Sequence, residues 1–162
     1  MYDCNEFNNL AENGMALPAP LTALIKTHQL ANVLCVGYTP DESVSQASSI
    51  TQVSTDNLME NSFLKRVDLV ALSQSALDLD DASRNAVIAK CRDQLAQKVL
   101  LELGLDDRGM TETECLALGF VRCALTERNR YYLFDLKTYK PVPDWLNPKF
   151  WANPQNWDRY RW

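Results

Sequence analysis

The sequence of 162 residues predicts an α/β domain in three layers, with a mostly parallel sheet that closes in an antiparallel hairpin. Residues 33–36, 67–72 and 99–103 are nearly unbroken apolar runs, which is typical of parallel strands covered on both faces. A helical pattern lies between the last two runs, and two more strand-like runs flank a short polar turn near the end. Strands that alternate with helices before a final hairpin indicate this fold class.

The first helix is expected from Pro20, a residue suited to a first helical turn, to about Gln29. Its apolar side recurs at helical spacing through Leu21, Leu24, Ile25 and His28. His28 is therefore interpreted as a helix-end residue rather than as a base or a metal ligand. The first strand follows at residues 33–36, and Gly37 ends it.

The next segment is predicted from caps and apolar positions. Asp41 can cap a short helix over residues 42–47, and residues 50–54 are predicted to form a second strand. Residues 56–65 are interpreted as a connection to the strand at 67–72.

The most regular helix is expected after a loop at residues 73–79, with Asp80 or Asp81 as its cap. The apolar positions predicted to face inward are Val87, Ile88, Cys91 and Leu95, and the positions predicted to face outward are Arg84, Lys90, Arg92 and Gln94. A fourth strand over residues 99–103 follows at once.

The last elements are a helix and a hairpin. Thr111 and Glu114 form a capping-box pattern that opens a short helix, and Gly119 stops it. Residues 120–125 and 131–136 are predicted to pair as antiparallel strands.

Composition divides the chain into three parts. Residues 1–17 are polar and Asn-rich and predict an arm or short helix, residues 18–140 form the α/β domain, and residues 141–162 form a tail rich in tryptophan. An exposed tail of this kind would present a large apolar area, so it is predicted to pack on the domain. No secretory signal or membrane-spanning run is recognised, so a cytoplasmic protein is expected, with no membrane partner.

Charge and cysteine usage exclude several classes of site. Residues 1–119 hold 8 Lys and Arg against 17 Asp and Glu, whereas residues 120–162 hold 8 against 4. The acidic whole disfavours nucleic acid as a partner, although the basic C-terminal end, with 11 of the 15 aromatic residues, leaves it as an alternative. Five scattered cysteines and one histidine predict neither a disulfide framework nor a metal site.

The order of elements and three short motifs resemble class I S-adenosylmethionine (SAM)-dependent methyltransferases, which have a Rossmann-like sheet. Residues 33–41 resemble the first motif of that family, whose usual form is Val-Leu-acid-x-Gly-x-Gly-x-Gly. Asp56 resembles the acidic residue that meets the adenine amino group, and residues 67–72 resemble the strand of the fourth motif. The resemblance implies a cofactor site at Gly37, Tyr38, Thr39, Asp56 and Ser73.

The motifs depart from the family at the positions that bind cofactor. Thr39 and Asp41 stand where two glycines are usual, and Cys35 replaces the acid. A β-branched residue is poor where the backbone needs positive φ or close approach to a ligand. The stretch 41–50 is too short for the usual elements, so the sheet is expected to lack about one βα unit and, with it, the acid that holds the ribose.

These departures favour a methyltransferase-like domain that has lost catalysis and binds another molecule, with no cofactor and with an unidentified protein partner left open. The alternative is a SAM-dependent methyltransferase of unknown substrate, with unassigned catalytic residues. A nucleic-acid-associated module and an unrelated α/β fold are the remaining hypotheses.

Overall fold

Six strands form one sheet in the computed structural model, which describes residues 17–38, 49–106, 109–140, 153–156 and 159. The strand order is β2-β1-β3-β4-β6-β5. The strands are β1 (Asn32–Val36), β2 (Ser49–Val53), β3 (Val67–Leu72), β4 (Ala96–Gly104), β5 (Val121–Leu125) and β6 (Asn129–Asp135). The first four strands in this order are parallel, and β6 pairs antiparallel with both β4 and β5. The predicted fold class, a mostly parallel Rossmann-like sheet with a C-terminal hairpin, is confirmed.

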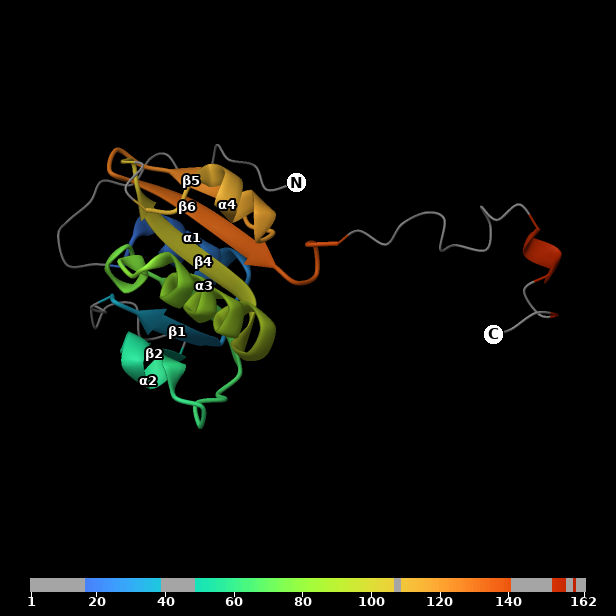
Figure 1. Ribbon diagram of the computed structural model, residues 1–162, viewed down its shortest axis with the longest axis horizontal. Helices are drawn as coiled ribbons and strands as arrows, with labels where there is room; N and C mark the ends of the chain where they lie inside the picture. The colour runs from blue at the N-terminus through green and yellow to red at the C-terminus, as the bar shows by residue number, and fades with distance from the viewer. Residues whose placement is uncertain (1–16, 39–48, 107–108, 141–152, 157–158, 160–162) are drawn as a thin grey trace.

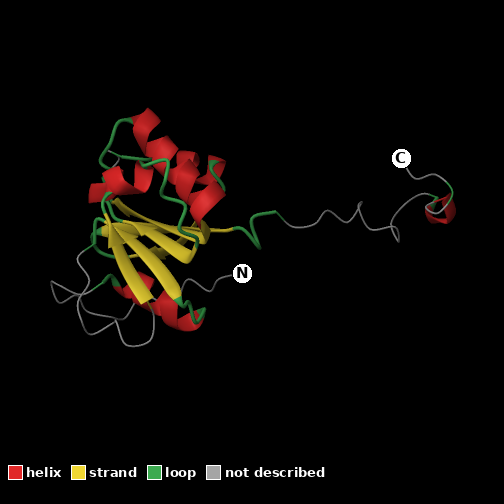
Figure 2. Cartoon of the chain, turned by 90° about the horizontal axis from the view of Figure 1, so that it is seen from below, coloured by secondary structure: helices red, strands yellow, loops and turns green. Residues whose placement is uncertain are grey.

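Helices cover the two faces of the sheet unequally (Figures 1 and 2). The helices are α1 (Ala19–Thr27), α2 (Thr55–Met59), α3 (Asp81–Lys90), which continues as the π-helical turn η3 (Cys91–Leu95), and α4 (Glu112–Ala117). Short 3-10 turns lie at η2 (Ser75–Leu77) and η6 (Pro154–Asn156). Helix α1 packs on one face, whereas α2, α3 and α4 pack on the other.

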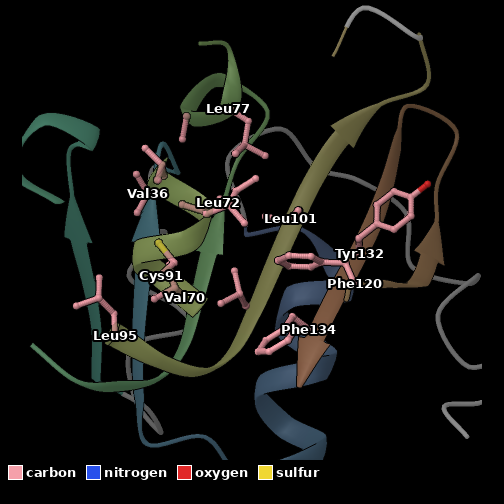
Figure 3. Close-up of a cluster of buried hydrophobic side chains, with 14 of the residues drawn as sticks. Val36, Val70, Leu72, Leu77, Cys91, Leu95, Leu101, Phe120, Tyr132 and Phe134 are labelled. Atoms are coloured by element: carbon pink, nitrogen blue, oxygen red, sulfur yellow. The ribbon is translucent and has the colours of Figure 1, made fainter. Parts of the chain in front are cut away.

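Alternation along the strands divides the apolar side chains into two cores. Leu34, Val70 and Leu101 point toward α3 and join the larger core, part of which Figure 3 shows. Cys35 and Leu69 point toward α1 and join the smaller core. Because both cores are buried, both faces of the central strands are covered, and this explains why the sequences of these strands are nearly continuous apolar runs.

Local signals position the helix ends. Asp80 caps α3 by accepting a hydrogen bond from Ser83 N at 3.1 Å, as predicted. The predicted capping box at Thr111 and Glu114 is present at the start of α4. His28 follows the last residue of α1 and caps it, so its interpretation as a helix-end residue is confirmed.

Several predicted boundaries were wrong. The connection predicted at 56–65 contains α2, which forms because the Ser54 side chain accepts a hydrogen bond from Asn57 N and Leu58 is fully buried. That cap ends β2 at Val53, one residue before the predicted end. Strand β4 begins three residues earlier than predicted, because η3 ends at Leu95 and the strand starts at the next residue.

Some predictions fall on residues that the structure does not describe. They are the first 16 residues of the arm predicted at 1–17, the short helix at 42–47 and the packing of most of the tail after residue 140. These stay predictions.

Candidate functional site

A cleft of about 670 Å³ lies at the carboxyl ends of β1, β3 and β4, and we call it the switch-point cleft. Its lining includes Gly37, Ser73, Arg84, Glu102, Gly104 and Arg130. The chain leaves β1 toward β2 on one side, whereas it leaves β3 toward β4 on the other. Ligands of open α/β sheets bind at such a reversal of strand order, so this cleft is the candidate binding site.

Gly37 brings the backbone of β1 close to Ser73 in this cleft. Its φ is +79°, and a Cβ atom at this position would lie 2.1 Å from Ser73 Oγ and 2.8 Å from Ser75 Oγ. Ser73 N donates to Val36 O at 3.0 Å, which holds the ends of β1 and β3 together. The two serine hydroxyls lie 2.8 Å apart, so one side of the cleft presents hydroxyls beside an open glycine backbone.

Tyr38 and Glu102 link the ends of β1 and β4. Tyr38 Oη donates to Glu102 Oε2 at 2.5 Å, and Asn129 Nδ2 donates to Glu102 Oε1 at 2.7 Å. Burial and the neighbouring Glu102 carboxylate raise the pKa of Tyr38 well above its ordinary value. Tyr38 therefore stays a hydrogen-bond donor at neutral pH, and both carboxylate oxygens of Glu102 are engaged.

Two arginines face the cleft from the α3 side of the sheet. Arg84, in the first turns of α3, has only 7% of its side chain exposed, and its Nη2 donates to Asp81 Oδ1 at 2.7 Å. Arg130, on β6, donates from Nε to Gly104 O at 3.1 Å. Arg84 Nε and Arg130 Nη2 are buried without a hydrogen-bond partner within the described part of the chain.

The outward orientation predicted for Arg84 was wrong. Arg84 precedes Val87 and Ile88 by three and four residues, so it lies on the buried face of α3. From the sequence, the charge of Arg84 predicted that its side chain would face solvent. In the structure the guanidinium lines the cleft, while the aliphatic part of the side chain is buried on the inner face of the helix. The spacing itself was the signal that could have identified this residue.

The structure brings together some of the residues that the resemblance implied. Gly37, Tyr38 and Ser73 line the switch-point cleft. Asp56 is exposed in the first turn of α2 and is not among the described residues that line it. Thr39 lies outside the described residues. The cofactor-binding role of these five residues stays a prediction.

Among the lining residues that the sequence interpretation missed are Arg84, Glu102 and Arg130. Glu102 carried a usable signal, because a carboxylate near the carboxyl end of a buried parallel strand points to the ligand edge of the sheet. Arg130 carried none, since its place depends on the register of the hairpin.

Within the described residues no group of three or more His, Cys, Asp or Glu side chains could hold a metal ion. Cys35, Cys91, Cys115 and Cys123 are free thiols. Burial raises the pKa of the Cys35 thiol to about 11, so it cannot replace the negative charge of the acid usual at this position. No helix in the described ranges is long and apolar enough to cross a bilayer.

Comparisons with known proteins identify a family and a fold. The model of a family of unknown function, DUF6231, matches residues 15–162. A search among curated proteins finds no match.

Among solved structures, the chain is similar to magnesium protoporphyrin IX methyltransferase (ChlM) from Synechocystis PCC 6803 with bound SAM, at 11% identity and a TM-score of 0.50. That alignment covers 70% of this chain and 75% of the other. The methyltransferase domain of a bacterial protein, CtHen1-CN, aligns at 11% identity and a TM-score of 0.49, over 72% of this chain and 96% of the other. The domain is therefore methyltransferase-like in fold and divergent in sequence.

Proposed function

Since this chain belongs to DUF6231, a family of unknown function, we propose its role from the site itself: it binds a small organic molecule in the switch-point cleft and does not transfer methyl groups. The observation that carries the binding role is the open cleft of about 670 Å³ where the strand order reverses. Its volume lies in the range of small-molecule sites.

Three features support the loss of methyl transfer. Thr39 and Asp41 replace glycines of the first motif, so close approach of a cofactor to the backbone there is disfavoured. Cys35 is fully buried in the core beside α1, is not among the described residues that line the cleft, and has a thiol that carries no charge at neutral pH. Asp56, the residue expected to meet the adenine, is not among the described residues of the cleft lining.

A SAM-dependent methyltransferase is the second candidate, and Gly37 favours it. The left-handed backbone of Gly37, with Ser73 closely apposed, keeps the one glycine of the first motif that follows β1 directly. This candidate requires SAM to bind with the affinity of a cofactor.

Calorimetric titration of the intact protein with SAM and with S-adenosylhomocysteine separates the two candidates. We expect no binding tighter than a dissociation constant of about 10 µM, which corresponds to about 7 kcal/mol. Tighter binding of either compound would overturn the loss of methyl transfer.

The binding role is tested by closing the cleft. Gln74 is exposed in the lining, so Gln74→Trp should fill the opening without entering a core. Gln94 is also exposed, but it does not line the switch-point cleft, and Gln94→Trp is the matched control. In a thermal-shift screen of metabolites, ligands should stabilise the natural protein and the control but not Gln74→Trp. A full panel that stabilises none of the three, or all three equally, would contradict the proposal.

A further inference from the structure

The switch-point cleft contains positive charge that nothing in the described chain fully satisfies. Arg84 is more than nine-tenths buried, and a guanidinium keeps its charge throughout the physiological pH range. Its one described ion-pair partner, Asp81, has a side chain that is 84% exposed, so water screens that carboxylate strongly. Arg84 Nε is left without an acceptor.

Arg130 repeats this arrangement from another element. It lies opposite Leu103 in the β4–β6 pairing, on the same face of the sheet as α3 and α4. Its Nε donates a hydrogen bond to Gly104 O at the end of β4, whereas its Nη2 is buried and has no acceptor in the described chain. Two guanidiniums from separate elements therefore line one cleft, and each has one buried nitrogen without an acceptor in the described chain.

The electrostatics of α4 place the two arginines near neighbouring residues. The hydrogen bond from Thr111 N is the main cause of the lowered pKa of Glu114, and the charge of Arg84 acts in the same direction. Burial raises the pKa of Cys115 to about 11, and the charge of Arg130 opposes that rise. The charges of Arg84 and Arg130 thus act on two adjacent residues of α4.

Acidic side chains also line the cleft, but in the described chain none of them accepts a hydrogen bond from the unused donors of Arg84 and Arg130. Both oxygens of Glu102 accept hydrogen bonds from Tyr38 and Asn129. Asp78 and Asp106 also line the cleft, but both residues are exposed, so their fields are screened by water. Buried donors that lack partners are rare in folded proteins and point to an acceptor that the described chain does not itself supply.

We propose that Arg84 and Arg130 form an anion subsite of the switch-point cleft, which holds a carboxylate or phosphate group of the bound small molecule. The inference rests on the proposed binding role and adds the chemical class of the ligand. Planar guanidinium groups match the paired oxygens of carboxylates and phosphates, and hydrogen bonds between ionised partners are the strong ones.

Binding of inorganic phosphate and of acetate to the natural protein tests this subsite, followed by NMR chemical-shift titration at fixed ionic strength. Preference for phosphate would indicate a phosphate group on the ligand, and preference for acetate would indicate a carboxylate. Arg84→Gln and Arg130→Gln should each raise the dissociation constant of the preferred anion at least about tenfold. Arg66→Gln is the matched control, because Arg66 is exposed and lies in a different cavity, and it should leave that constant unchanged.

A conservative variant separates lost charge from lost geometry. Arg84→Lys keeps the positive charge but lacks the planar guanidinium with its paired N–H donors. We therefore expect it to bind the anion more weakly than the natural protein and more tightly than Arg84→Gln. Far-ultraviolet circular dichroism confirms that each variant is folded. Absence of anion binding in the natural protein, or equal loss in Arg66→Gln, would overturn the proposal.

The anion subsite and the binding role can fail separately. A neutral ligand that Gln74→Trp excludes, with no binding of phosphate or acetate, would remove the anion subsite and keep the binding role. Anion binding that needs both arginines, with no organic ligand sensitive to Gln74→Trp, would keep the subsite and remove the binding role.

Discussion

Positively charged side chains lie in the interior at both ends of the sheet, but only at the amino end is the cation paired with a buried acid of the chain. At the amino end, Lys98 and Asp135 face each other across β4 and β6 and form a buried ion pair. Asp68 accepts from Ala31 N at 3.0 Å and Asn32 N at 2.9 Å. At the carboxyl end, Arg84 and Arg130 keep buried N–H groups without acceptors in the described chain.

We infer from this difference that the charged pair at the amino end supports folding, whereas the two arginines at the carboxyl end serve to bind a ligand. A buried pair whose partners both come from the chain is complete when the chain folds, and removing one partner leaves the other uncompensated. A buried guanidinium without a full set of acceptors contributes little to folding, and its unused donors call for another explanation. The following predictions test this contrast, from the largest expected effect to the smallest.

The largest effect is expected at the amino end. Asp135→Asn should lower the free energy of unfolding by about 3–5 kcal/mol at neutral pH, because it leaves the buried Lys98 ammonium unpaired. Urea denaturation measures the loss. Asp93→Asn, which breaks a more exposed pair with Arg92, should lower it by less than about 1 kcal/mol. Similar losses in the two variants would show that burial does not distinguish the pairs.

Gly37→Ala should lower the free energy of unfolding by about 2 kcal/mol. The φ of +79° disfavours any side chain, and the new Cβ would meet Ser73 Oγ. Adding Ser73→Ala should recover only the part of the steric loss that comes from Ser73 Oγ, because the new Cβ would still lie 2.8 Å from Ser75 Oγ. Gly109→Ala is the control, because nothing lies within 4 Å of a Cβ atom there, and it should change stability by less than about 0.5 kcal/mol. Equal urea midpoints for the two glycine variants would refute this account of Gly37.

Replacing each buried cation by methionine compares the two ends directly. Arg84→Met should leave the free energy of unfolding unchanged or raise it by up to about 1 kcal/mol, because it removes a guanidinium that lacks a buried acid as partner. Lys98→Met removes the buried cation that forms the ion pair with Asp135, and should be strongly destabilising. A loss above about 2 kcal/mol in Arg84→Met would mean that Arg84 supports folding, as Lys98 does.

The smallest effect concerns pH and the amino end. The pKa of His28 is lowered, first by burial and then by the charge of Lys98, while Asp135 acts in the opposite direction. Below the unfolded-state pKa the unfolded chain binds this proton more readily, so the His28 contribution to stability is lost as pH falls through that value. His28→Asn should lose less in thermal midpoint between pH 7.5 and pH 5.5 than the natural protein does.

Because His28 is the only histidine of the chain, a single imidazole resonance reports its titration. An NMR midpoint at or above about pH 6.5, the ordinary value, would contradict the lowered pKa.

The strands and caps could be predicted because their signals are local. Asp80 and Thr111 each hydrogen-bond three residues ahead, and a nearly continuous apolar run such as β3 fits a strand with two covered faces. Helix α2 was missed because five residues are too few to show a period, although the cap at Ser54 was present.

The positive side of the cleft could not be predicted in the same way. Arg84 and Arg130 are 46 positions apart in the sequence numbering and meet one cleft only through the pairing of β4 with β6. Polar side chains are exposed to solvent on average. In a cleft, however, an arginine can place its guanidinium at the opening and bury its aliphatic stem. The sequence interpretation found the glycine turn and overlooked the charge beside it.

The junction between α3 and β4 sets where this chain can tolerate insertions and deletions. Leu95 ends the π-helical turn and Ala96 begins β4, although connections between a helix and a strand usually have about 2 to 6 residues. One residue added to α3 after Arg84 would rotate the preceding turns by about 100° about the helix axis, which would carry Arg84 out of the cleft. Residues 60–62, in contrast, are exposed between α2 and β3. Length variation among related chains is therefore expected at residues 60–62 and not at the α3–β4 junction.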